Sequence, residues 1–169
     1  MPRIADKGLS GQHRQVATAP VDYVGIDPGQ SGGIAVLCGG TVDAHKMPET
    51  ERDIWQIFKD VEMPCIAVIE KVHSMPDQGV ASSFKFGRGY GFLRGCLIAG
   101  GIPFEEVTPQ AWIKGLAIPS KAKTETRTQW KNRLKAMAQQ LYPDLKVTLA
   151  TADALLIATY NKRKHEGTL

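Results

Sequence analysis

Three acidic residues each lie at one boundary of an apolar run, and their placement constrains the fold more than any other feature of the sequence. Asp27 follows the run VDYVGI, Glu70 ends CIAVIE, and Asp153 opens ALLIATY. The first two runs have β-strand character and the third has helical character. About 40 and 80 residues separate the three carboxylates, so only folding can gather them. Gathered carboxylates repel each other unless a divalent cation neutralises them, which points to a metal-dependent enzyme acting on phosphates.

The order of apolar runs and turn signals predicts one α/β domain. Short apolar runs bounded by turn residues indicate strands, and apolar residues recurring every three or four positions indicate helices. The patterns predict strands over 21–26, 33–37, 41–46, 65–70 and 102–107, and helices over 53–61, 79–99, 120–141 and 152–160. Three hairpin-linked strands followed by alternating helices and strands resemble the ribonuclease H-like arrangement, a five-stranded mixed sheet flanked by helices. We expect residues 1–20 to be a flexible extension and 21–169 to form this domain.

Basic residues are concentrated in two segments of a chain whose net charge is +4. Seven lysines and arginines between positions 114 and 135 are opposed only by Glu125, and a second group occupies 162–165. Clustering of this kind is expected of a protein that binds a phosphate backbone. The alternative is an ordinary solvated helix face.

Two absences narrow the class of protein. The sequence has no run of 18 apolar residues, so we expect no membrane span. Three widely spaced cysteines form no Cys-x-x-Cys pair, which argues against a disulfide framework or a zinc knuckle and favours a reducing compartment.

The segment 79–99 is rich in glycine and yet has helical spacing. Gly87, Gly91 and Gly95 recur every four residues, on one face of a helix. Each glycine costs such a helix about 1 kcal/mol relative to alanine, so the repetition indicates close approach by another backbone. That backbone belongs either to the sheet or to a second subunit.

Four motifs in order carry a resemblance to a known family. They are GIDPGQSGG, VIEKVHSMPDQGVASSFKFGRGYG, EEVTPQAWIKG and TADALLIATY, and they span about 21–164. In these motifs the chain resembles the RuvC-like Holliday-junction resolvases, above all the phage and prophage members and the related chloroplast resolvases. The resemblance implies a cytoplasmic homodimer, in a bacterium or a phage-infected cell, that makes paired nicks in four-way DNA junctions with Mg²⁺, for which Mn²⁺ substitutes.

The resemblance also implies roles for particular residues. Asp27, Glu70 and Asp153 match the family's metal-binding carboxylates, with Asp27 bridging two ions. Taken singly, Asp27 before Pro28 also fits a turn aspartate, and Asp153 fits an aspartate near a helix N-terminus. Family members usually carry a further acidic residue or histidine three or four positions before the last aspartate, where this chain has Ala150 and Leu149. Water, or the hydroxyl of a neighbouring threonine (148 or 151), would then complete the ligand set.

Other residues are candidates for the DNA. The family places lysines near the scissile phosphate in the region that follows Thr-Pro-Gln, and Lys121 or Lys123 is the expected charge stabiliser there. His73 with Met75 is a candidate wedge at the junction centre, the alternative being a loop histidine without a role. We interpret the aromatic side chains of the glycine-rich segment as core or dimer interface. The remaining candidates for phosphate contacts are Lys85, Arg88, Arg94, Lys114 and Arg127.

Three functions from different classes remain open. The first is the structure-selective endonuclease, and the second is another nuclease on the same scaffold, acting on branched DNA or on RNA–DNA hybrids. The third is a dimeric junction-binding module whose activity is weakened or absent because position 150 is alanine. A sugar-kinase-like or actin-like phosphate-binding lobe is set aside, because such folds need two lobes and this chain has about half the length.

Overall fold

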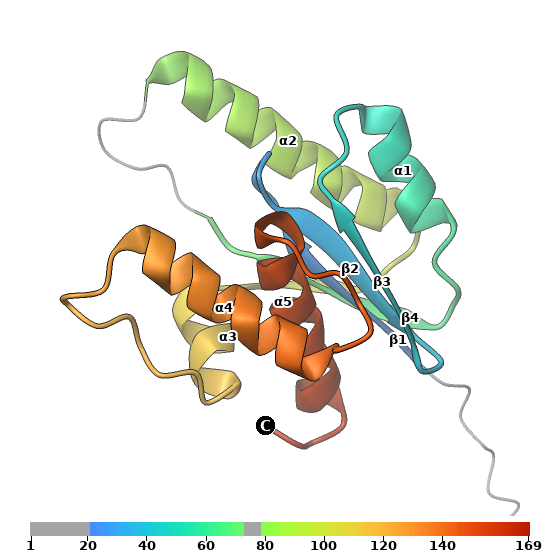
Figure 1. Cartoon of the computed structure of the whole chain (residues 1–169). Coiled ribbons are helices and arrows are strands. Elements are labelled where there is room, and N and C mark those ends of the chain that lie inside the picture. Colours follow the sequence, from blue (N-terminus) through green and yellow to red (C-terminus); the bar gives the residue numbers. More distant parts are fainter. Residues whose placement is uncertain (1–20, 73–78) are drawn as a thin grey trace, which may run out of the picture.

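A five-stranded mixed sheet forms the centre of the computed structural model, which describes residues 21–72 and 79–169 (Figure 1). The strands are β1 (Asp22–Asp27), β2 (Gly33–Cys38), β3 (Thr41–Lys46), β4 (Cys65–Glu70) and β5 (Phe104–Val107). Their order in the sheet is β3-β2-β1-β4-β5. The first three strands are antiparallel, and β4 and β5 run parallel to β1. The predicted fold class, a single α/β domain of ribonuclease H-like type, is confirmed.

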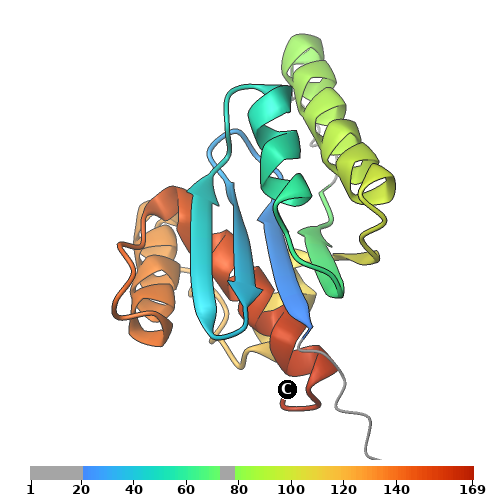
Figure 2. The same ribbon diagram turned by 90° about the vertical axis from the view of Figure 1, so that its right-hand side faces the viewer.

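Helices cover both faces of the sheet (Figure 2). The helices α1 (Glu51–Lys59) and α2 (Val80–Ala99) lie on one face, and α3 (Pro109–Gly115), α4 (Arg127–Leu141) and α5 (Leu149–His165) lie on the other. Each face has its own cluster of buried apolar side chains. None of the helices described for this chain combines the length and the apolar character needed to cross a membrane.

Capping threonines explain three of the differences between prediction and structure. The helix expected over 120–141 begins only at Arg127, because Thr126 and Gln129 form a capping box there. The final helix begins at Leu149 and not at 152, because Thr148 and Thr151 form a second capping box. The capping threonine Thr50 likewise starts α1 two residues before the expected position.

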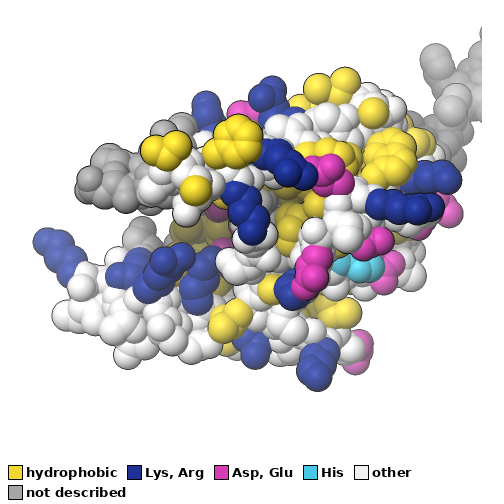
Figure 3. All heavy atoms as spheres, turned by 90° about the horizontal axis from the view of Figure 1, so that it is seen from above, with side chains coloured by type: hydrophobic (Ala, Val, Ile, Leu, Met, Phe, Trp, Pro, Cys, Tyr) yellow, Lys and Arg dark blue, Asp and Glu magenta, His cyan; other side chains and the backbone are white. Residues whose placement is uncertain are grey.

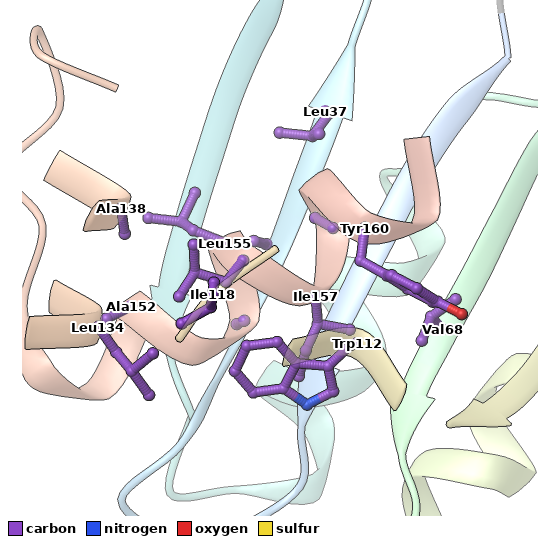
Figure 4. Close-up of a cluster of buried hydrophobic side chains, with 14 of the residues drawn as sticks. Leu37, Val68, Trp112, Ile118, Leu134, Ala138, Ala152, Leu155, Ile157 and Tyr160 are labelled. Carbon is purple, nitrogen blue, oxygen red and sulfur yellow. The ribbon is translucent and has the colours of Figure 1, made fainter. Parts of the chain in front are cut away.

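The helix α5 is the centre of the larger core (Figure 4). An unbroken stretch of eleven residues, 151–161, is buried in it. Its fit to the sheet depends on Gly25, since a Cβ atom there would lie 2.2 Å from the backbone nitrogen of Ala158. Buried Asn161 donates hydrogen bonds to the carbonyls of Val24 (3.0 Å) and Ile66 (2.8 Å). These contacts fix the distance of α5 from the sheet and its position along β1 and β4.

Candidate active site

Asp27 lies at the end of β1, where a glycine turn wraps around its carboxylate. The backbone N–H of Gly29 points to Asp27 Oδ1 at 3.5 Å, at the limit of a hydrogen bond. A Cβ atom at Gly32 would lie 2.6 Å from Asp27 Cγ and still closer to the Asp27 carbonyl oxygen. The turn after β1 therefore requires glycine at position 32 in order to hold this carboxylate.

Glu70 ends the neighbouring parallel strand. The register pairs Ile26 with Ile69, so Asp27 and Glu70 are adjacent across the two strand ends. The indole Nε1 of Trp112, a fully buried residue of α3, donates a 2.9 Å hydrogen bond to Glu70 Oε1. This bond fixes the direction of the Glu70 carboxylate.

Asp153 comes from the second turn of α5. A Cβ atom at Gly33 would lie 2.8 Å from the carbonyl oxygen of Ala150, so the start of α5 packs directly on β2 beside the turn. Asp153 is only 5% exposed. Its Oδ2 accepts a hydrogen bond from Lys131 Nζ, and its Oδ1 is buried without a hydrogen-bond partner among the described residues.

The three carboxylates influence one another electrostatically. Burial, followed by repulsion from Asp153, raises the pKa of Asp27 to about 6. Burial raises the pKa of Glu70 to about 7, and repulsion from Asp27 and Asp153 adds to the effect, while the hydrogen bond from Trp112 opposes it. The folded site therefore disfavours full ionisation of its acids without a cation.

Lys131 of α4 supplies the positive charge at this site, and the sequence analysis did not single it out. Burial opposes its charge, yet Asp153, Asp27 and Glu70 together raise its pKa above the ordinary value. The sequence does contain a signal for this role. Lys131 precedes the buried residues Leu134 and Ala138 by three and seven positions, which places it on the same face of α4. A lysine on the buried stripe of a helix requires an acidic partner.

The negative charge of the three carboxylates suits a divalent cation, but their side chains are too far apart to bind one ion together. No three His, Cys, Asp or Glu side chains in the described ranges are gathered closely enough to hold a metal ion. The unpartnered Oδ1 of Asp153 and the raised pKa values of Asp27 and Glu70 nevertheless mark oxygens that lack a positive partner. The hydroxyls of Thr148 and Thr151 bond to the backbone of the α5 cap and to each other.

The other predicted residues lie around this site or outside the description. Lys121, Lys123 and Arg127 are exposed before and at the start of α4. Lys114 and Lys121 line one surface pocket of about 710 Å³, together with Trp130. The remaining predictions fall in or near α2: Lys85 is exposed, Arg88 pairs with Glu51 at 2.7 Å, and His73 and Met75 lie outside the described residues.

Comparisons with known proteins show similarity in fold. Neither a protein-family model nor a curated protein matches the chain. The structure of T. thermophilus RuvC in complex with a Holliday junction substrate superposes with a TM-score of 0.61 at 16% identity, covering 88% of this chain and 98% of that one. A second Thermus thermophilus RuvC structure gives a TM-score of 0.56 at 18% identity, covering 87% and 97%. At these identities the likeness establishes the fold alone.

Proposed function

We propose that the protein is a structure-selective endodeoxyribonuclease that resolves four-way DNA junctions. The observation that carries the proposal is the placement of Asp27 and Glu70 at adjacent strand ends, within electrostatic range of Asp153 and of its partner Lys131. The likeness in fold to a RuvC bound to a Holliday junction supports it. The resemblance of the four sequence motifs to phage and prophage resolvases is a second, independent support.

In this proposal each residue at the site has a defined task. Asp27, Glu70 and Asp153 would hold Mg²⁺ or Mn²⁺, and the ion would supply an activated water and stabilise the departing 3′ oxygen. Cleavage would then leave 5′-phosphates. Trp112 keeps the Glu70 carboxylate directed at the site through its hydrogen bond. Lys131, once released from Asp153, places its charge beside the scissile phosphate.

The surface around the site suits a branched polyanion. The molecule is hollowed between two lobes, and Lys and Arg side chains lie on both sides of the hollow (Figure 3). Lys85 and Arg88 belong to α2, whereas Lys114, Lys121, Lys123 and Arg127 follow β5. We expect these residues to contact phosphates, and we expect a homodimer to present two such sites to opposed strands.

Ala150 favours one alternative function. It occupies a position where the resembled family usually supplies a ligand, and the neighbouring threonine hydroxyls are engaged in the helix cap. A junction-binding module without cleavage follows if three carboxylates are too few. The same scaffold acting on RNA–DNA hybrids is the other alternative.

A junction labelled on each strand tests the proposal. An immobile four-way junction is incubated with the protein and Mg²⁺ or Mn²⁺ beside linear duplex, a replication fork and an RNA–DNA hybrid. We expect paired symmetric nicks on the junction, absent with Asp27→Asn and retained with the exposed control Asp43→Asn. Tight junction binding without nicks supports the module instead, and cleavage of the hybrid alone contradicts resolvase activity.

A further inference from the structure

The loop that joins α3 to α4, residues 116–126, contains neither helix nor strand (Figure 1). All residues from 119 to 124 are exposed. Among them are Lys121 and Lys123, the two lysines that we expect near the scissile phosphate. An exposed loop without regular structure keeps one conformation only where contacts with the rest of the chain offset its loss of conformational entropy. The contacts that hold this loop therefore decide where its lysines lie.

Arg133 of α4 makes most of these contacts. Its Nε and Nη2 atoms each donate a 2.9 Å hydrogen bond to the carboxylate of Glu125. Its Nη1 donates a 3.0 Å bond to the carbonyl of Pro119, and its Nη2 also donates a 3.3 Å bond to the carbonyl of Ser120. A planar guanidinium can reach all three acceptors at once, whereas the single ammonium group of a lysine cannot. One side chain thus ties the middle of the loop to its end.

Two further contacts fix the members of this pair. The ring of Trp130 lies against the guanidinium of Arg133, with 4.4 Å between the Cζ atom and the ring centroid, which is a cation–π contact. Glu125 Oε2 also accepts a 3.3 Å hydrogen bond from the backbone N–H of Ala122. The carboxylate therefore holds the backbone between Lys121 and Lys123 as well as the arginine.

These contacts change the interpretation of Arg133. In the sequence it is one of the clustered basic residues expected to serve a phosphate backbone, but in the structure its donors are directed at the loop. Arg94 of α2, another candidate for a phosphate contact, forms an ion pair with the single carboxylate of Glu106 at 3.0 Å. Lys121 and Lys123 form no ion pair with any residue that the structure describes. The loop therefore presents free lysines outward while Arg133 holds it from within.

We infer that Arg133 and Glu125 form a latch, which holds the loop in the conformation that presents Lys121 and Lys123 to DNA. Arg133 is then a positioning residue and not a phosphate contact. If the latch were absent, the loop would have to become ordered as DNA binds, and this cost would weaken binding. The inference takes from the proposed function only that the partner is DNA, and it adds how the chain places the lysines.

Limited digestion with trypsin tests the latch in the free protein, without DNA or metal. Arg133→Lys keeps the positive charge but loses the fork of hydrogen bonds. We expect cleavage after Lys121 and Lys123 to become about tenfold faster, because local opening exposes the backbone to the protease. Cleavage after Lys146, an exposed lysine between α4 and α5, serves as the internal reference.

Arg52→Lys is the matched control for this digestion, because Arg52 is an exposed arginine of α1. It is expected to leave the cleavage pattern unchanged. Circular dichroism checks that each variant is folded. Equal cleavage rates in folded Arg133→Lys and in the unaltered chain overturn the inference.

Binding to an immobile four-way junction separates the latch from simple charge attraction. Glu125→Gln removes an acid from a basic surface, so charge alone predicts tighter binding to a polyanion. The latch predicts the opposite, a binding constant about tenfold weaker. It also predicts a slope of log K against log[salt] that is smaller by about 1–2, because the two lysine contacts are lost. Tighter or unchanged binding by Glu125→Gln overturns the inference.

Asp144→Asn is the matched control for this binding, because it changes the charge equally at an exposed position beyond the end of α4. It is expected not to weaken binding. The double variant Glu125→Gln, Arg133→Lys is expected to bind no more weakly than the weaker single variant, because the two residues act as a unit. Additive losses would mean separate contacts with DNA and would contradict the latch.

The two measurements also separate this inference from the proposed function. An unaltered chain that does not bind the junction at low salt would refute the proposed function, and with it the role of the loop at DNA. The digestion would still decide whether Arg133 holds the loop. A chain that binds the junction but shows no effect of Arg133→Lys or Glu125→Gln would refute the latch and leave the proposed function standing.

Discussion

The two long helices on opposite faces of the sheet, α5 and α2, have similar apolar character but different surroundings. In α5 eleven of 17 residues are buried, because the sheet covers one side and α3 and α4 cover the other. In α2 only three of 20 residues are buried, because the core of its own chain covers one side only. Burial of a helix on every side requires neighbours on every side, and only α5 has them. The difference teaches that α5 completes the fold, whereas α2 leaves the large apolar side chains of Val80, Phe84 and Ile98 exposed.

The largest expected effect contrasts two glycines. Gly25→Ala places a Cβ atom against the backbone of α5, so we expect the free energy of unfolding to fall by about 3 kcal/mol or more. Gly91→Ala adds a methyl group in open space and removes a flexible residue from a helix. The folded monomer is expected to gain about 0.5–1 kcal/mol. Urea denaturation of a dilute, monomeric sample measures both, and similar losses at the two positions would contradict the comparison.

The next contrast concerns large side chains. Leu155 of α5 is fully buried, so Leu155→Ala is expected to cost about 2–5 kcal/mol of folding stability. Phe84→Ala in α2 is expected to change the stability of the monomer by less than about 0.5 kcal/mol while weakening the dimer. Thermal unfolding at low and high protein concentration separates the two effects. A large loss in the Phe84→Ala monomer would mean that this side chain packs within its own chain.

A smaller effect is expected where α4 meets α5. Lys131 competes with a divalent cation for Asp153, so Lys131→Met is expected to tighten Mn²⁺ binding about tenfold, or about 1.4 kcal/mol. Calorimetric titration of the protein with Mn²⁺ measures this change. Lys123→Met is the matched control, since Lys123 is exposed and expected to leave the affinity unchanged. Weaker binding in Lys131→Met would show that this lysine helps to hold the metal.

The last prediction concerns a pH dependence. Asp27 and Glu70 have pKa values of about 6 and 7 in the folded protein, above their ordinary values of 3.8 and 4.5. The folded chain therefore holds protons that the unfolded chain releases. Their contribution to stability is full below pH 4 and is lost as the pH rises through 6 and 7. Without metal, stability is expected to fall over this window.

The double variant Asp27→Asn, Glu70→Gln should flatten this decline, and Asp43→Asn should not. Denaturation curves at stepped pH in the presence of a chelator measure it. A decline that persists in the double variant would place its source elsewhere. Saturating Mg²⁺ is expected to reverse the decline, because it favours the ionised carboxylates.

Sequence patterns predicted the sheet better than they predicted the helix boundaries. Short apolar runs end at turn residues, which is why β3 and β4 were predicted at their observed bounds. The start of α4 depends on the capping box of Thr126 and Gln129, a signal within an uninterrupted polar stretch that was not used. The glycine repeat of α2 left two explanations open, and only the open space around Gly91 separates them.

The candidate site also contains residues that the sequence predicted and residues that it did not. The placement of Asp27, Glu70 and Asp153 near one another was predictable, because each lies at the boundary of an apolar run. Their role as metal ligands stays a prediction. Lys131 and Trp112 were missed because their roles arise from tertiary contacts with Asp153 and Glu70. The assignments of Lys121 and Lys123 as charge stabilisers remain predictions.

Cleavage of a cruciform in a supercoiled plasmid tests two claims most directly. The first is that the site of Asp27, Glu70 and Asp153 cuts DNA, and the second is that two copies of the chain, joined through α2, cut together. One nick relaxes the plasmid and removes the cruciform, so two cuts must fall within one binding event to yield linear DNA. The account predicts linear product from the unaltered protein with Mg²⁺, and mainly nicked circles from Gly91→Leu. Nicked circles from both proteins, or linear product from both, would contradict it.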